Sequence, residues 1–239
     1  MINALIVDDE RLARQELVSM LEDFNKIKVA GEAANADEAA ILITEKDPDL
    51  VFLDIQMPGK TGFELLEMLD NVPDVIFTTA YDEYALKAFE VNAFDYLLKP
   101  IDPKRLAESV NKYLENHVPR PKNQARTMLG KDDQVFVKDG DKCWFVRLDN
   151  IRLFESDGNY VKVFFDNFRP MIHKSLNALD EKLDDKIFFR ASRKHIINLA
   201  WVDAIETWFN GGLLVKLKGG EKIEVSRRQA SRFKVIMSL

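Results

Sequence analysis

The first half of the chain alternates short apolar runs with amphipathic segments, and this alternation constrains the fold more than any other feature. Apolar residues in the segments recur at spacings of three and four, as in a helix, whereas the short runs suit buried strands. Five strands that alternate with five helices predict a doubly wound parallel sheet with helices on both faces. The expected strands are 4–7, 28–33, 50–53, 75–77 and 94–98, and the expected helices are 10–24, 36–47, 61–70, 83–92 and 102–117.

The second half has a different pattern. A stretch with Pro, Lys and Arg but without periodicity predicts a linker near residues 117–128. Beyond it, strand-like runs flank turn signals that are typical of β-hairpins. Helices are expected only at 174–183 and 227–237, so this half is predicted to be mostly β. The turn signals are Asp139-Gly140-Asp141, Asp157-Gly158-Asn159, Asn210-Gly211-Gly212 and Gly219-Gly220.

Charge also divides between the halves. Residues 1–123 contain 13 Lys and Arg against 24 Asp and Glu, whereas residues 124–239 contain 21 against 16. The basic excess is strongest in residues 190–239, with 10 basic and 4 acidic residues. This asymmetry indicates two modules with different partners. Charge by itself predicts DNA binding only weakly, because basic stretches are usually solvated faces.

The N-terminus and the cysteine content bear on location. The opening MINALIVDDE turns acidic early and lacks the basic flank and cleavage site of a signal peptide. No apolar run approaches the roughly 18 residues of a membrane span. Cys143 is the single cysteine, which excludes an internal disulfide and a cysteine metal site. We therefore expect a cytoplasmic protein with no direct membrane insertion.

Polar side chains follow four of the five expected strands. In a doubly wound sheet the carboxyl ends of the strands border the crevice where ligands bind. Three carboxylates there would repel one another without a cation, and Mg²⁺ prefers carboxylate, water and phosphate oxygens. A lysine and a hydroxyl suit phosphoryl oxygens, and an aspartate can act as the nucleophile. The residues are Asp8, Asp9, Asp54, Thr78, Thr79 and Lys99.

Each of these residues also has an ordinary structural explanation. An acidic pair such as Asp8-Asp9 is more often a solvated loop or helix cap than a metal site, by roughly three to one. Thr79 alone is a polar residue at a strand end, and Lys99 alone is a surface charge. Four strand exits with matching chemistry favour phosphoryl transfer, because folding does not require such a convergence.

At these residues the first half resembles the receiver domain of bacterial two-component response regulators. The motifs are VDDE (7–10), FLDIQMPGKTG (52–62), TTAYDEYALKAF (78–89) and FDYLLKPI (94–101). The resemblance covers about residues 1–118 and implies a flavodoxin-like, five-stranded parallel sheet. It implies Asp54 as phosphoacceptor, Thr79 and Lys99 as phosphoryl contacts, and Tyr96 as an aromatic switch.

The same resemblance implies a cofactor and partners. Mg²⁺ would bind Asp9, Asp54 and the backbone carbonyl of Gln56, with Asp8 helping through water. The family's Lys-Pro peptide bond, here Lys99-Pro100, is usually cis. A sensor histidine kinase would supply the phosphoryl group, and the surface formed by residues 83–99 would pair two receivers.

Residues 130–239 resemble the LytTR output domain, a β-rich DNA-binding module, with residues 119–129 as the linker. The motifs are LFESDGNYVKVF (153–164), FFRASRKHIINLAWVDAIE (188–206) and KIEVSRRQASRFK (222–234). In this family loop side chains read the DNA, and a recognition helix is not used. The matching positions are Asn159, Tyr160, Arg193 and Arg228 for bases, and Lys194 and Arg227 for phosphates. The loop at 157–160 lacks a basic residue, so a simple tight turn is the alternative.

Other side chains have structural interpretations. We expect Cys143 to be a small core residue. Trp201 and Trp208 are expected in the β core, not on a base-stacking platform. His117 and His173 lack partners at metal-site spacing, and His195 suits packing or a phosphate contact better than metal binding.

Together these implications predict a transcription regulator whose Asp54 is phosphorylated by a histidine kinase. Phosphorylated receivers would form a homodimer, and two output domains would bind repeated sites in double-stranded promoter DNA. The chain would catalyse only its own phosphoryl transfer and dephosphorylation. The first alternative is a signalling adaptor whose β-rich half binds protein or a small messenger. A phosphohydrolase is less favoured, because no second acid or histidine is evident as a general acid.

Overall fold

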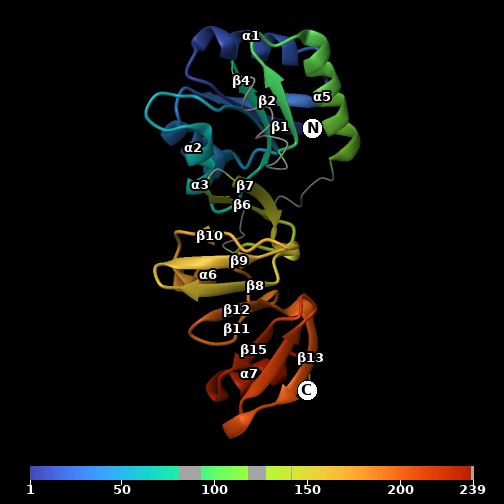
Figure 1. Cartoon of the computed structure of the whole chain (residues 1–239). Coiled ribbons are helices and arrows are strands. Elements are labelled where there is room, and N and C mark those ends of the chain that lie inside the picture. The colour runs from blue at the N-terminus through green and yellow to red at the C-terminus, as the bar shows by residue number, and fades with distance from the viewer. Residues whose placement is uncertain (81–92, 118–127, 141, 238–239) are drawn as a thin grey trace. The chain divides into compact units, whose positions relative to one another are not determined.

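The chain forms two compact units in the computed structural model, which describes residues 1–80, 93–117, 128–140 and 142–237 (Figure 1). Among these residues, every helix is too short or too polar to cross a membrane. The first unit comprises Met1–Asn123, Gln134–Phe136 and Gly140–Phe145, and the second comprises Gln124–Asp133, Val137–Asp139 and Val146–Leu239. The predicted domain limits at residues 118 and 130 stay predictions.

A five-stranded parallel sheet forms the centre of the first unit. The strand order is β2-β1-β3-β4-β5, so the order reverses between β1 and β3. This is the flavodoxin-like, doubly wound order, and it confirms the predicted fold class. The strands are β1 (Ile2–Val7), β2 (Ile27–Ala33), β3 (Leu50–Asp54), β4 (Asp74–Thr79) and β5 (Asp95–Leu98).

Helices cover both faces of this sheet. On one face α1 (Arg11–Leu21) and α5 (Pro103–Asn116) bury apolar residues, and on the other face α2 (Ala36–Lys46) and α3 (Gly62–Met68) do so. Successive strand residues point to opposite faces, which is why the central strand β3 is apolar at every position before Asp54. The expected helix at 83–92 lies outside the described residues.

Side-chain caps fix where three of these helices begin. The Asn35 side chain accepts a hydrogen bond from the Glu38 amide, and Thr61 forms a capping box with Glu64. Asp102 caps α5 with Pro at the first helical position, as the Asp-Pro pair predicts.

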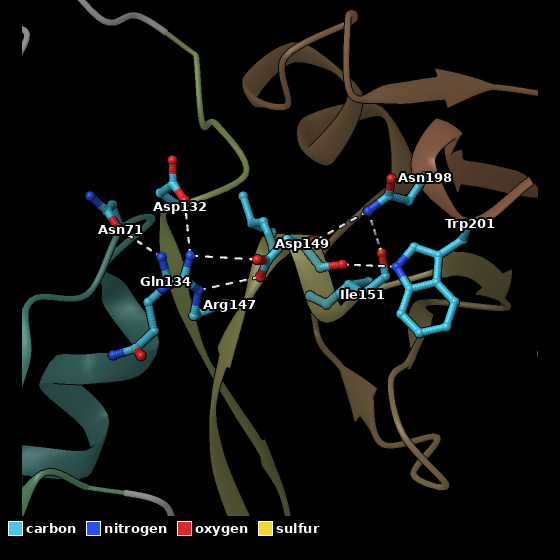
Figure 2. Close-up of polar contacts among 9 residues, drawn as sticks. Asn71, Asp132, Gln134, Arg147, Asp149, Ile151, Asn198 and Trp201 are labelled. Carbon is cyan, nitrogen blue, oxygen red and sulfur yellow. Dashed lines mark hydrogen bonds and ion pairs between the residues drawn. The ribbon is translucent and has the colours of Figure 1, made fainter. Parts of the chain in front are cut away.

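The hairpin of β6 (Gln134–Asp139) and β7 (Lys142–Arg147) adds side chains to the core of the first unit. Phe136, Cys143 and Phe145 are buried in the apolar cluster that contains α3 and β4. At the hairpin's start the Val72 amide donates to the Gln134 carbonyl at 2.8 Å. The Gln134 amide donates to Asn71 Oδ1 at 3.1 Å (Figure 2). Because a two-stranded hairpin is marginal alone, this packing stabilises it.

The second unit contains two antiparallel sheets, which confirms that this half is mostly β. Their orders are β10-β9-β8-β12-β11 and β13-β14-β15. The two expected helices are present as α6 (Leu176–Lys182) and α7 (Arg227–Ile236). The strands are β8 (Leu153–Asp157), β9 (Tyr160–Phe164), β10 (Met171–Ile172), β11 (Phe188–Arg190), β12 (His195–Asn198), β13 (Val202–Thr207), β14 (Leu213–Leu217) and β15 (Lys222–Val225).

Two short 3₁₀ turns of the second unit are joined by hydrogen bonds. The turns are η1 (Leu148–Asn150) and η2 (Leu199–Trp201). The buried Asn198 amide donates to the carbonyls of Ile151 at 2.9 Å and Leu148 at 3.3 Å. Trp201 Nε1 donates to the Asp149 carbonyl at 2.8 Å (Figure 2). These bonds satisfy the buried Asn198 amide and the half-buried Trp201 indole.

Candidate functional site

The carboxyl ends of β1, β3 and β5 bring three carboxylates and one ammonium group together. One carboxylate oxygen from each of Asp8, Asp9 and Asp54 lies within 4.8 Å of the others. Asp8 and Asp54 are buried, whereas Asp9 is exposed. Lys99 Nζ lies 2.5 Å from Asp54 Oδ2 and 2.7 Å from Asp8 Oδ2. The four residues thus come from three strand ends to one cluster.

Backbone groups orient the two buried carboxylates. The Glu10 amide donates to Asp8 Oδ1 at 2.9 Å, and the Gln56 amide donates to Asp54 Oδ1 at 3.0 Å. Each carboxylate therefore uses one oxygen for the backbone and the other for Lys99. The Lys99 amide donates to the Thr79 carbonyl at 2.7 Å, and the Lys99-Pro100 bond is cis.

Burial and charge shift the pKa values of the central pair. Burial raises the pKa of the Asp54 carboxyl above its usual value, and the Lys99 and Gln56 hydrogen bonds oppose this effect. Burial by itself lowers the pKa of Lys99, but the hydrogen bonds to Asp54 and Asp8 raise it above its usual value. Lys99 is therefore a permanent cation at neutral pH.

The oxygen donors of the cluster fit a hard divalent cation. With Asp8, Asp9 and Asp54 ionised, three negative charges face the single ammonium group of Lys99. Mg²⁺ takes carboxylate oxygens together with water and phosphate oxygens. The donor set is therefore suited to Mg²⁺, and the excess negative charge provides the reason for binding it.

Two residues that the sequence analysis did not single out also shape this site. A Cβ atom on Gly62, the first residue of α3, would lie 2.4 Å from the Asp54 carbonyl oxygen. Only glycine lets α3 begin so close to β3. Arg14 Nη1 donates to the Asp8 carbonyl at 2.7 Å. A Gly directly after a Thr cap was the available signal for Gly62, whereas nothing in the sequence marked Arg14.

The remaining predicted residues of the first unit lie on β4, on β5 and just after β3. Thr79 is the last residue of β4 and is fully buried. Gln56 is exposed just after β3. Tyr96 is buried in β5, paired in register with Phe77, and belongs to the same apolar cluster as α3. Most of the surface at 83–99 that was expected to pair receivers lies outside the described residues.

Three loops of the second unit meet at one edge. The Ser156 amide donates to the Lys194 carbonyl at 2.8 Å, which joins the end of β8 to the β11–β12 loop. The Ser226 amide donates to the Ala191 carbonyl at 3.2 Å, which joins the start of α7 to the same loop. All six residues predicted to contact DNA are exposed and lie in the β8–β9 turn, the β11–β12 loop or the start of α7: Asn159, Tyr160, Arg193, Lys194, Arg227 and Arg228.

Charges at this edge differ from loop to loop. The β8–β9 connection is a tight turn with Gly158 at φ 61°, and Asp157 pairs with Lys162 at 2.5 Å. The Lys162 hydrogen bond and charge lower the pKa of Asp157. Among the described residues, neither Arg193 nor Arg228 forms an ion pair, so this edge presents exposed cations.

The prediction that Trp208 is a core residue is wrong. Trp208 is 37% exposed and its neighbour Phe209 is 77% exposed. The chain leaves β13 at Thr207 and forms a short 3₁₀ turn, η3 (Phe209–Gly211), which carries these side chains out of the sheet. Trp201, in contrast, is half-buried and hydrogen-bonded, and Cys143 is buried as predicted.

Comparison with known proteins matches both halves of the chain. Residues 4–111 match the response regulator receiver domain, and residues 141–238 match the LytTr DNA-binding domain. A relative from Vibrio cholerae, described as an uncharacterized response regulatory protein, is 38% identical over 99% of this chain and 99% of its own. The sensory transduction protein LytT of Enterococcus faecalis is 34% identical over 100% of both chains. The LytT protein of Bacillus subtilis is 33% identical over the same shares.

Proposed function

The chain belongs to the two-component response regulators that join a receiver domain to a LytTR DNA-binding domain and control transcription, and we propose that phosphorylation of Asp54 governs its binding to promoter DNA. The observation that carries this proposal is the contact of Lys99 with both Asp54 and Asp8 at the strand ends. Such a pocket presents a carboxylate nucleophile beside a fixed cation.

Asp54 would act as the nucleophile toward a phosphohistidine of the sensor kinase. A carboxylate oxygen of Asp54 forms the new bond to phosphorus while the bond from phosphorus to the histidine nitrogen breaks, and that electron pair leaves with the nitrogen. Lys99 Nζ contacts Asp54 Oδ2 in this structure, and after transfer it would contact a phosphoryl oxygen instead. The Thr79 hydroxyl would donate to another phosphoryl oxygen.

Asp9, Asp54 and the backbone carbonyl of Gln56 would hold Mg²⁺, with Asp8 acting through water. Support comes from the three carboxylate oxygens that lie within 4.8 Å of one another. When bound, the metal neutralises charge on the phosphoryl oxygens during transfer. The chain would promote only its own phosphorylation and dephosphorylation.

The phosphoryl group would act on the output half through the receiver surface. It adds about −1.5 to −2 charges at Asp54, and Lys99 and Thr79 would reorganise around it. The change would reach Tyr96 and the surface at 83–99, where two receivers would pair into a homodimer.

Each dimer would then carry two DNA-binding edges and bind repeated sites in promoter DNA. Arg193 and Arg228 would contact guanine edges in the major groove, and Asn159 and Tyr160 would add contacts from the β8–β9 turn. Lys194 and Arg227 would contact phosphates. The exposure of all these residues at one edge supports the assignment.

Asp54→Ala tests the phosphoacceptor directly. The full chain is incubated with phosphoramidate and Mg²⁺, and phosphorylated protein is separated by phosphate-affinity electrophoresis. Wild type and the control Asp37→Ala, which removes an exposed carboxylate, should be phosphorylated equally, and Asp54→Ala should not be phosphorylated. Undiminished phosphorylation of Asp54→Ala would show that another residue accepts the phosphoryl group.

The DNA-contact residues need a separate experiment. Arg193→Ala and Arg228→Ala should weaken binding to promoter fragments by about 10- to 100-fold each, since a bidentate base contact supplies that discrimination. Arg147→Ala, which removes an exposed arginine paired with Asp132 and Asp149, is the control. Unchanged binding by both test variants would favour the adaptor alternative.

A further inference from the structure

Trp208 and Phe209 form an exposed aromatic pair at the end of β13. Their ring centroids lie 4.9 Å apart with an angle of 69° between the ring planes, so the edge of one ring faces the other. Phe209 leaves 77% of its surface in water. Scattered exposed apolar side chains are normal, but two adjacent aromatic rings on one turn form a small apolar patch that suits a contact surface.

This pair lies beside the start of α7. The Trp208 amide donates to the Gly212 carbonyl at 2.9 Å and closes the turn. A Cβ atom on Gly212 would lie 3.1 Å from the Val225 carbonyl oxygen, and one on Gly211 would lie 4.0 Å from Arg227 Cγ. The aromatic turn is therefore packed against the segment that carries Arg227 and Arg228.

The charge of the neighbouring residues favours DNA as the partner of this pair. Arg227 and Arg228 are exposed, and Ser226 joins them to the loop of Arg193 through its hydrogen bond to Ala191. Such a row of cations attracts a polyanion. Among the base edges of the major groove, the thymine methyl group is the apolar feature, and phenylalanine is one of the side chains that contact it.

We propose that Phe209, supported by the Trp208 ring, contacts the C5-methyl group of a thymine next to the base pairs that Arg228 reaches. This inference rests on the proposed function, because it requires DNA at this edge. It adds a preference for thymine that arginine and lysine contacts do not supply.

Removal of single methyl groups from the DNA tests this contact. A duplex is first selected from a randomised pool by the full chain after treatment with phosphoramidate and Mg²⁺. Each thymine is then replaced by deoxyuridine, which deletes only the C5-methyl group. Wild-type affinity should fall about fourfold at one or two positions, the value of one buried methyl group. Phe209→Ser should bind the thymine and deoxyuridine duplexes equally at those positions.

A matched variant controls for the loss of an exposed aromatic ring. Phe168 is 43% exposed and follows β9, which starts at the DNA-contact edge with Tyr160 and ends at Phe164. Phe168→Ser should keep the full response to deoxyuridine. Thermal unfolding of both variants establishes that they fold. Trp208→Phe should keep DNA binding but lose part of the tryptophan quenching that DNA causes in wild type.

The outcomes separate this inference from the function on which it rests. If wild type binds no duplex, the DNA-binding assignment of this edge fails. If wild type binds and Arg228→Ala weakens binding, but Phe209→Ser responds to deoxyuridine as wild type does, only the thymine contact is overturned. If sedimentation shows that Phe209→Ser changes self-association and leaves the deoxyuridine response intact, the pair is a contact between two copies and the inference fails.

Discussion

At the scale of single residues, burial and charge act in opposite directions on the pKa of Asp54, the proposed phosphoacceptor. Asp8 and Asp54 are both buried, and Lys99 bridges them with one ammonium group. Removing one partner of a buried ion pair destabilises a protein by more than the pair contributed to its stability, because the remaining charge stays buried without compensation. Lys99 therefore favours the ionised form of Asp54, and in the proposed mechanism it would later bind a phosphoryl oxygen.

Lys99→Met removes the ammonium group at nearly constant length. We expect the rate of Asp54 phosphorylation by phosphoramidate to fall by about 100-fold, because a fixed donor at the developing charge is lost. Rates are measured by phosphate-affinity electrophoresis over time. Lys28→Met, at an exposed position of β2, is the control and should keep the wild-type rate. A wild-type rate for Lys99→Met would exclude the assigned role of Lys99.

Asp95 gives a prediction on pH dependence. Burial acts to raise its pKa, but the Arg105 guanidinium at 2.5 Å and the Tyr96 amide lower it below the usual value. A depressed pKa contributes stability above the unfolded-state pKa of about 3.9, and this stability is lost as the pH falls through the folded-state pKa.

Asp95→Asn should therefore destabilise the protein by about 1–2 kcal/mol at pH 7, a value reduced because Arg105 is partly exposed. The difference from wild type should shrink below pH ~4, where the native carboxylate of wild type becomes protonated. Urea unfolding at pH 7 and at pH 3 measures both values, with the exposed Asp23→Asn as control. A difference that grows toward low pH would contradict the assigned direction of the shift.

At the scale of elements, the strand ends were predictable and the hairpin packing was not. Parallel strands share one carboxyl edge, so the positions of Asp9, Asp54 and Lys99 in the chain suffice to bring them together. The alternation of apolar residues in β6 and β7 predicts a buried face but does not identify what covers it. The roles of Gly62 and Arg14 were not predictable for a similar reason. The close approach of Gly62 to Asp54 and the bond from Arg14 to the Asp8 carbonyl depend on tertiary geometry.

Trp208 is the opposite case, an exposed residue that the sequence predicted to be buried. Trp208 was expected in the β core together with Trp201, yet β13 ends at Thr207 and a 3₁₀ turn follows. Aromatic residues are enriched both in cores and at interfaces, so residue type alone does not separate the two environments.

The hairpin packing leads to a prediction on stability. The Phe145 ring lies 5.2 Å from the Phe136 ring and 6.4 Å from the Phe77 ring, and Phe145 is buried. Phe145→Ala should reduce the free energy of unfolding of the first unit by about 3–5 kcal/mol, the usual cost of deleting a buried phenylalanine. Phe168→Ala removes an exposed ring and should cost much less. Urea unfolding followed by circular dichroism compares them, and equal effects would exclude the hairpin from the core.

At the scale of the whole molecule, the two halves carry net charges of opposite sign, which suits their different proposed roles. The acidic half, with 24 Asp and Glu against 13 Lys and Arg, contains the proposed metal site, and the basic excess of 190–239 includes four of the residues proposed to contact DNA. A net charge of −6 limits non-specific attraction to DNA, so binding must depend on particular contacts and on the number of edges engaged. The proposed pairing of two phosphorylated chains would double that number.

The proposed dimer predicts a dependence on the number and spacing of sites. After phosphoramidate treatment, wild type should bind a duplex with two repeated sites about 10- to 100-fold more tightly than a duplex with one, because the second contact becomes intramolecular. Asp54→Ala should show no comparable gain. Insertion of about 5 base pairs between the sites should abolish the gain, since half a helical turn moves the second site to the opposite side of the DNA. Fluorescence anisotropy at fixed salt measures these affinities, and a gain that survives both Asp54→Ala and the insertion would refute phosphorylation-dependent pairing on DNA.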